Sequence, residues 1–438
     1  MDVLRTPDER FANLPDYPFE PHYLEVDGLR LHYVDEGPPN APPVLMMHGE
    51  PSWSFLYRKM IPLIVDAGYR AVAPDLVGFG KSDKPAAVED YTYQRHVDWM
   101  WGWLQAVGLE KITLVGQDWG SLIGLRLVAE HPDLFDRVVL SNGGLPTGDQ
   151  KMSEAFMKWL AFSERVSRLP VRRLLQTSTE TTLSDEVLAA YVAPFPDETY
   201  KAGASHFASL VPISPKDPAA PANRKAWRKL MRFEKPFLTA FSDGDPITRG
   251  AEGAFQRLVP GAKGRRHITI ENAGHYLQED KGEELAGVVL SFIANSSREE
   301  TGEVDRFLGT WELDPSQSNY EVREPPASGV YSIQPDEDGY LLNLAWTTAH
   351  GDGMEMAYKA IPNGKIYPYT ENPAAADAIS MTRVNEQRLD SASFRGGKQI
   401  AWASRILSSD GQVMTVDQSG LGPDGERYHN LSVYHRVS

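Results

Sequence analysis

Short apolar runs that alternate with helical stretches are the feature that most narrows the fold of this chain. Two early runs, His22–Val26 and Leu29–Val34, flank Asp27-Gly28 and predict a hairpin. Helices fit between the later runs, for example at Tyr93–Val107 and Ser121–Glu130. The later strand candidates are Pro43–Met47, Arg70–Pro74, Ile112–Gly116, Arg137–Ser141, Pro236–Phe241 and His267–Glu271. Strands that alternate with helices in this way predict an α/β fold with a mostly parallel sheet.

Two segments depart from this alternation. Residues from about 145 to 222 are helical in pattern and contain few strand-like runs, which predicts a helical cap inserted into the sheet domain. A helix at Glu283–Ala294 is expected to close that domain, which we place at residues 1–296. Residues 297–304 are polar and charged without apolar periodicity, and they predict a linker.

The pattern changes after this linker. Short alternating runs lie between turns that contain Gly, Asp and Pro, which predicts an all-β, barrel-like domain over residues 305–438. The clearest runs are Val330–Ile333, Tyr340–Trp346, Met354–Ala360 and Val413–Asp417. A chain of 438 residues is long for one core, so two domains are the default expectation.

Charge and composition exclude several functions. The net charge of −16 would repel phosphate, which argues against a nucleic-acid partner. The absence of cysteine removes disulfides, thiolate metal sites and cysteine nucleophiles. The N-terminus lacks a signal-peptide pattern, and no run approaches the roughly 20 apolar residues of a membrane helix. We therefore expect a cytoplasmic protein with no membrane partner.

The segment Gly116-Gln117-Asp118-Trp119-Gly120 lies directly after a strand candidate and directly before a helix. This is the arrangement in which glycines permit a strained turn that presents a central nucleophile. The central residue here is aspartate in place of serine. Asp118 alone is also consistent with a simple helix cap, so its role depends on its partners.

Two further loops supply those partners. His275 follows the last strand candidate, and Asp245 follows the preceding one, with Asp243 as a rival for the same role. The chain order nucleophile, acid, histidine is that of the α/β-hydrolases, in which the three loops meet at one sheet edge. The loop His48-Gly49-Glu50-Pro51 adds a backbone N–H, so the expected oxyanion-hole donors are those of Glu50 and Trp119.

An aspartate nucleophile selects a particular chemistry. A carboxylate is already anionic at pH 7 and can displace a leaving group from saturated carbon, which forms an ester that water can hydrolyse. A serine would form an unreactive ether at the same carbon. His275 then serves as base for the water, and Asp245 orients and stabilises its ring.

Together these motifs resemble the haloalkane dehalogenases over roughly residues 1–295. The resemblance implies hydrolysis of a small halogenated alkane by water, with release of halide and no cofactor or metal. It implies that Trp119 and the cap residue Trp159 bind the halide, and that Glu50 lies near the hydrolytic water. The substrate pocket would include Phe156, Leu122 and Phe207, with Ala208 where some relatives have proline.

Alternatives remain for both parts of the chain. Epoxide hydrolases share the nucleophilic aspartate and use two cap tyrosines, for which Tyr191 and Tyr200 are candidates, and Trp159 is also consistent with a cap-core aromatic. Gly309-Thr310-Trp311 and the closing Tyr434-His435-Arg436 are similar to lipocalin- or fatty-acid-binding-like barrels. That similarity implies an apolar ligand, whereas a stabilising appendage is the alternative. A hydrophobic-ligand-binding protein with a vestigial hydrolase domain is the non-enzymatic hypothesis.

Overall fold

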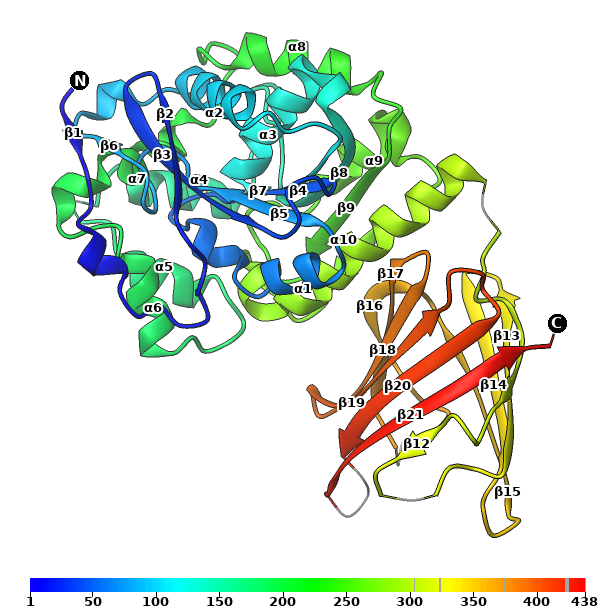
Figure 1. Cartoon of the computed structure of the whole chain (residues 1–438). Coiled ribbons are helices and arrows are strands. Elements are labelled where there is room, and N and C mark those ends of the chain that lie inside the picture. Colours follow the sequence, from blue (N-terminus) through cyan, green and yellow to red (C-terminus); the bar gives the residue numbers. More distant parts are fainter. Residues whose placement is uncertain (167, 303, 323, 373–374, 422–424, 438) are drawn as a thin grey trace. The chain divides into compact units, whose positions relative to one another are not determined.

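The structure is a computed structural model that describes residues 1–166, 168–302, 304–322, 324–372, 375–421 and 425–437. It divides into two compact units, Met1–Leu285 and Ala286–Ser438. Figure 1 shows the helices and strands of both. Within the described part of the chain, every helix is too short or too polar to span a membrane.

An eight-stranded sheet forms the centre of the first unit, in the order β10-β9-β8-β7-β4-β5-β3-β2. Its strands are β2 (His22–Val26), β3 (Leu29–Glu36), β4 (Pro43–Met47), β5 (Arg70–Pro74), β7 (Ile112–Asp118), β8 (Phe135–Gly143), β9 (Phe237–Ser242) and β10 (Ile268–Ile270). The neighbours from β10 to β5 are parallel, and the edge pairs β5–β3 and β3–β2 are antiparallel. The predicted mostly parallel α/β sheet is confirmed.

Capping residues in the sequence mark the ends of α2, one of the helices beside the sheet. In α2 (Tyr93–Val107), the Thr92 side chain accepts a hydrogen bond from the Arg95 N–H at 3.1 Å, and Gly108 follows with a φ of 70°. A side-chain cap and a left-handed glycine satisfy the free backbone groups at the two ends of a helix. The other helices beside the sheet are α1 (Ile61–Asp66), α3 (Trp119–Glu130), α8 (Ala220–Leu230) and α9 (Glu252–Leu258).

Between β8 and β9 the described chain forms helices and no strands. They include α4 (Glu154–Ser163), α5 (Val171–Thr177), α6 (Asp185–Val192) and α7 (Ala202–His206). A buried polar network ties α6 to the sheet domain, because the Tyr191 hydroxyl donates to Glu279, which also accepts from Arg58 at 2.9 Å. Loss of either partner of this buried Arg58–Glu279 ion pair would leave an uncompensated charge and strongly destabilise the protein.

The last helix is longer than the sequence suggested. α10 covers Leu277–Thr301, with a kink at Lys281, and replaces both the shorter closing helix and the first part of the linker predicted at 297–304. Residues 297–301 are polar, but arginine and glutamate are good helix formers, and a solvent-facing turn needs no apolar periodicity. Polarity therefore indicated exposure at these residues and not the end of the helix.

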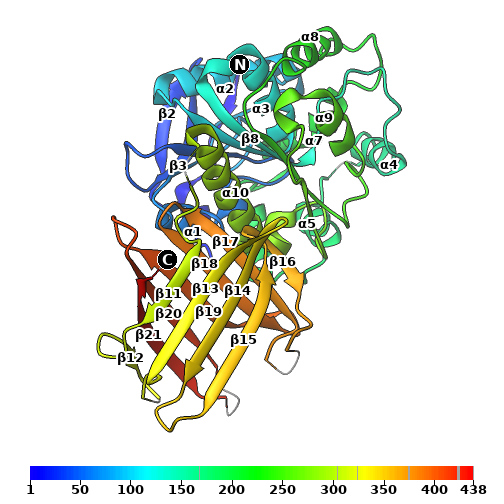
Figure 2. The same ribbon diagram turned by 90° about the vertical axis from the view of Figure 1, so that its right-hand side faces the viewer.

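The second unit is an antiparallel all-β half-barrel, shown from two sides in Figure 1 and Figure 2. Its strands follow the order β15-β14-β13-β11-β21-β20-β19-β18-β17-β16, and β12 pairs with β21. Their bounds are β11 (Gly309–Leu313), β12 (Asn319–Tyr320), β13 (Ser328–Asp336), β14 (Gly339–Thr347), β15 (Gly353–Ala360), β16 (Asn363–Pro368), β17 (Ala378–Asn385), β18 (Arg388–Arg395), β19 (Lys398–Leu407), β20 (Val413–Leu421) and β21 (Arg427–Arg436). The predicted barrel-like domain is confirmed.

Trp311 lies at the centre of the core of this half-barrel. It is fully buried, and its indole N–H donates to the Phe307 carbonyl at 3.2 Å. The Arg436 guanidinium lies 4.1 Å above the Trp311 ring and donates to the Leu308 carbonyl at 2.8 Å. The tryptophan and arginine singled out in the sequence thus join the first and last strands of the unit.

We expect Trp311→Ala to lower the free energy of unfolding of the second unit by about 3–5 kcal/mol, because it leaves a large cavity and removes the cation–π contact. Urea unfolding followed by circular dichroism measures this change. Val304 is 79 % exposed, so Val304→Ala should alter stability by less than about 0.5 kcal/mol. Equal effects of the two substitutions would contradict the central position of Trp311.

Candidate active site

Asp118 lies at the tight turn between β7 and α3. Its backbone has a φ of 50° and a ψ of −128°, which is strained for a residue with a side chain. A Cβ at Gly120 would lie 1.9 Å from the carbonyl oxygen of Met47, so only glycine allows α3 to start this close to β4. The turn therefore projects the Asp118 carboxylate beyond the carboxyl end of the sheet.

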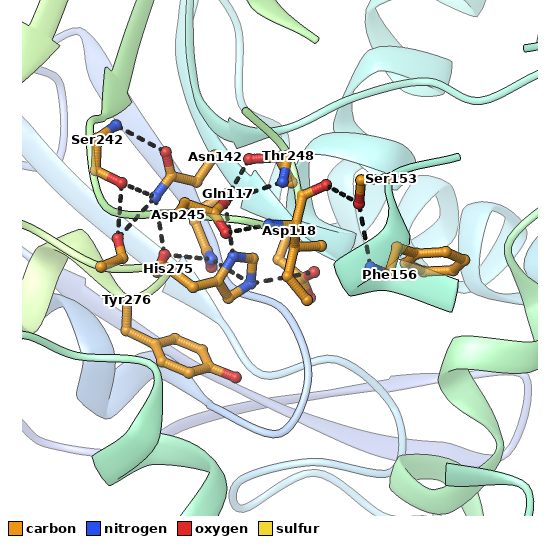
Figure 3. A network of polar contacts seen from close by, with 12 residues as sticks. Gln117, Asp118, Asn142, Ser153, Phe156, Ser242, Asp245, Thr248, His275 and Tyr276 are labelled. Atoms are coloured by element: carbon orange, nitrogen blue, oxygen red, sulfur yellow. Dashed lines mark hydrogen bonds and ion pairs between the residues drawn. The ribbon is translucent and has the colours of Figure 1, made fainter. Parts of the chain in front are cut away.

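His275 lies between two carboxylates (Figure 3). Its Nδ1 is 3.0 Å from Asp245 Oδ2, and its Nε2 is 3.5 Å from Asp118 Oδ2. Asp243, the other candidate acid, is exposed, and its carboxylate accepts instead from the Ala273 N–H at 3.4 Å. The structure thus brings Asp118, His275 and Asp245 together and leaves Asp243 outside.

Charge rather than burial controls the protonation of this group. Burial by itself lowers the pKa of His275, but Asp245 and Asp118 more than offset this and raise it to about 10. Burial raises the pKa of Asp245, yet His275 and hydrogen bonds from Thr248 and Ile247 lower it to about 2. Among Asp118, His275 and Asp245, the proton therefore resides on the His275 imidazole when both carboxylates are ionised.

Polar residues that sequence reasoning missed hold the three groups in place. The Asn142 side-chain amide donates to Ser242 Oγ at 2.8 Å and to the carbonyls of Gly274 and His275 at 3.0 Å. The Gln117 amide nitrogen lies 3.2 Å from His275 Nε2 and donates to the His275 carbonyl. Asn142 lies at the carboxyl end of β8, the one signal in the sequence that would have identified it.

Glu50 contributes a backbone donor and a buried side chain. Its N–H donates to Asp118 Oδ1 at 2.8 Å, and its carbonyl accepts from the Tyr276 hydroxyl at 2.6 Å. Burial and the nearby Asp118 charge raise the pKa of the Glu50 carboxyl well above its usual value, and its Oε1 has no hydrogen-bond partner among the described residues. Trp119, the other expected donor, is the first residue of α3.

A cavity of about 770 Å³ lies over these groups and is lined by both the sheet domain and the helices between β8 and β9. Its walls are mainly apolar, as is usual for a small-molecule site. Of the residues expected to form the site, it is lined by Glu50, Asp118, Trp119, Leu122, Phe156, Trp159 and His275. No group of three or more His, Asp or Glu side chains in the described chain could hold a metal ion.

Phe207 is the expected pocket residue that the structure places elsewhere. It is fully buried and stacks on the Trp119 ring, with ring centroids 4.3 Å apart, while Ala208 takes the place in the cavity lining. The sequence placed the pocket wall in the correct segment but one residue too early, because neighbouring residues of the short 3₁₀ helix Phe207–Leu210 point to different sides. Phe207 thus supports Trp119 from behind rather than forming the wall.

Comparison with known proteins places the chain among enzymes of one kind. Residues 42–282 match the family model of the alpha/beta hydrolase fold. A haloalkane dehalogenase of Psychrobacter cryohalolentis is 56% identical over 303 residues, which is 68% of this chain and 100% of the relative. One from Mycolicibacterium paratuberculosis is 54% identical over 297 residues, 67% of this chain and 98% of the relative.

A solved structure gives the same match. The haloalkane dehalogenase DpaA from Paraglaciecola agarilytica, described as tetrameric, superposes with a TM-score of 0.62 at 35% identity. It covers 65% of this chain and 97% of its own. About a third of the chain lies outside all of these alignments.

The position of His275 between two carboxylates predicts that Asp118→Asn lowers the pKa of His275 below about 10, because the substitution removes one of the charges that raise it. ¹⁵N NMR titration of the imidazole nitrogens measures the shift. Asp243→Asn removes an exposed charge with no contact to the ring and should leave the titration of His275 in place. An unchanged pKa in the Asp118→Asn variant would show that the carboxylate does not control the imidazole.

Proposed function

Because the chain belongs to the haloalkane dehalogenases and hydrolyses carbon–halogen bonds, we propose that Asp118 is its nucleophile, and His275 and Asp245 its base and orienting acid. The observation that carries the proposal is the asymmetric environment of the Asp118 carboxylate. Oδ1 accepts the Glu50 N–H at 2.8 Å, whereas Oδ2 lies beside His275. One oxygen is held in place while the other attacks.

In the first step, Asp118 Oδ2 forms a bond to the halogenated carbon as the carbon–halogen bond breaks. The halide departs with the bonding electrons, and the enzyme carries an alkyl ester. The indole N–H groups of Trp119 and Trp159 are neutral donors that stabilise the developing anion in an apolar cavity. Among the described residues, neither indole N–H has a protein acceptor, which leaves both available to a halide.

In the second step, His275 Nε2 takes a proton from water, and the resulting hydroxide attacks Cγ of the ester. The N–H groups of Glu50 and Trp119 stabilise the negative charge on Oδ1. Collapse releases the alcohol oxygen, which takes the proton from His275. The Asp118 carboxyl then transfers its own proton to His275, which restores the starting imidazolium. The overall reaction converts haloalkane and water into alcohol, halide and a proton.

Ester formation also prepares the base for this second step. The Asp118 charge is one of the causes of the raised pKa of His275, and the ester has no charge. The pKa of His275 therefore falls when the ester forms, and the imidazolium releases its proton to solvent, so that the ring is neutral when a base is needed. Asp245 remains ionised and stabilises the imidazolium that follows.

The cap tyrosines do not support epoxide opening. An epoxide needs phenols that donate to its oxygen, and neither Tyr191 nor Tyr200 lines the cavity. The Tyr191 hydroxyl donates instead to the buried Glu279. Halide displacement, which needs only the two indole donors, is the reaction that this lining favours.

The two-step scheme predicts that His275→Gln accumulates the alkyl ester, because the first step needs only the Asp118 carboxylate. After exposure to 1-bromobutane, mass spectrometry of the peptide containing Asp118 should show a butyl group in place of a proton. The double variant with Asp118→Asn is the control and should carry no adduct. Absence of the adduct in His275→Gln, or its presence on another residue, would refute the scheme.

Halide binding by Trp159 predicts that Trp159→Phe lowers kcat/KM for halide release from 1-bromobutane by about 100-fold, since it removes one donor and keeps an aromatic ring. A matched control is Trp101→Phe, because Trp101 stacks on His131 and does not line the cavity. Its kcat/KM should stay within about twofold of wild type. A similar result for the Trp159→Phe variant would assign this tryptophan to packing alone.

For the second unit we propose a hydrophobic-ligand-binding role. A cavity of about 900 Å³ inside the half-barrel supports it, since this volume is in the range of small-molecule sites. Trp346, Met356 and Ile400 are among the apolar side chains that line the cavity. A purely structural appendage would be expected to fill this space with side chains.

A further inference from the structure

The cavity of the half-barrel lies at one end of its strands. On β14, Leu342 belongs to the buried core whereas Trp346 lines the cavity. On β20, Met414 belongs to the core whereas Leu421 lines the cavity. The core therefore fills one end of the half-barrel, and the cavity occupies the end with the β14–β15 and β18–β19 connections. The boundary between them is the floor of the cavity.

Arg405 on β19 lies at this floor. It pairs in register with the core residues Leu389 and Val416, lines the cavity and is only 4 % exposed. Its guanidinium donates to three hydroxyl groups from the surrounding strands. They are those of Tyr331 at 2.6 Å, Ser391 at 3.0 Å and Tyr358 at 3.1 Å.

These partners are neutral hydroxyl groups, so the buried charge of Arg405 has no ion pair among the described residues. The charge of Asp390 on β18 acts on Arg405 only from beyond ion-pair distance, since its carboxylate is bonded to Arg388 at 2.9 Å and to Ser404 at 2.6 Å. Arg383, the other buried arginine of this unit, pairs with Asp305. Burial of a charge without an opposite charge is unfavourable, so a site of this kind favours an anion.

The composition of the cavity lining agrees with this preference. The described lining contains two arginines, Arg395 and Arg405, and no aspartate or glutamate, although the whole chain has a net charge of −16. The rest of the lining is apolar, aromatic or neutral and polar. An anionic group at the floor with an apolar tail above it matches this distribution.

We propose that Arg405 binds the head group of a long-chain carboxylate whose tail fills the cavity, an inference that rests on the proposed ligand-binding role of the second unit. The guanidinium is a planar donor that matches the two oxygens of a carboxylate. The Tyr331 and Tyr358 hydroxyls can turn and donate to the same oxygens, because a phenol is both donor and acceptor. The tail then packs against Trp346, Met356 and other apolar walls.

Calorimetric titration of the full chain with dodecanoate, 1-dodecanol and dodecyltrimethylammonium tests the proposal. Dodecanoate should bind most tightly, and Arg405→Gln should weaken its binding at least about tenfold while leaving that of 1-dodecanol nearly unchanged. Arg427→Gln is the matched control, because Arg427 is exposed and does not line the cavity. It should bind dodecanoate as wild type does.

Retained binding of 1-dodecanol by the Arg405→Gln variant shows that its cavity is intact. If that variant fails to fold, Arg405→Lys keeps the charge and loses the planar fork, and it should bind dodecanoate more weakly than wild type but more tightly than it binds dodecyltrimethylammonium. Equal affinity for dodecanoate and 1-dodecanol, or dodecanoate binding that is insensitive to Arg405, would overturn the carboxylate site and leave the apolar-ligand role standing. Binding of none of the three probes would overturn both.

Discussion

The turn between β7 and α3 is the constraint on which the active site depends. It holds Asp118 at a positive φ and brings α3 so close to β4 that a Cβ at Gly120 would meet the Met47 carbonyl at 1.9 Å. Because α3 lies so close to β4, the loop after β4 lies beside the Asp118 carboxylate, and the Glu50 N–H in that loop donates to Asp118 Oδ1. Strain at one residue thus aligns the proposed nucleophile with its backbone donor before any substrate binds.

The charges around this turn form a system that changes during the reaction. His275 lies between two carboxylates that raise its pKa, and in the proposed mechanism one of them, Asp118, becomes an ester. Asp245 is buried and receives hydrogen bonds from Ile247 and Thr248, so it keeps its charge throughout. In the proposed mechanism, the covalent step therefore converts an imidazolium into a base by removing one of the two charges that raise its pKa.

Much of the first unit follows from sequence patterns because they are local. Short apolar runs predicted the strands and a helical pattern predicted α2, and Thr92 and Gly108 set the ends of that helix. The triad was expected from chain order, since the carboxyl ends of parallel strands meet at one edge. Asp243 and Asp245 could not be separated in this way, because both lie in one loop and only the fold decides which faces His275.

Other features depended on neighbours that are distant in the sequence. Asn142 and Gln117 hold His275 from β8 and β7. Gln117 occupies a variable position of the motif around Asp118, and Asn142 lies outside every motif, so the sequence assigned neither a role. Phe207 lies behind Trp119, whereas its neighbour Ala208 lines the cavity, a difference of one position that a short 3₁₀ helix decides. In the half-barrel, Arg405 has no local motif, and its burial beside hydroxyl groups of β13, β15 and β18 exists only once the strands are paired.

The sequence by itself thus determined the sheet domain, the strained turn with its aspartate and the chemistry that a carboxylate nucleophile allows. Each of these depends on spacing along the chain or on the intrinsic reactivity of a residue. Only the tertiary structure decided which acid meets His275, which residues line the two cavities and which buried charge lacks an ion pair among the described residues. Those properties depend on distances and solvent exclusion between segments far apart in the chain, which local patterns do not encode.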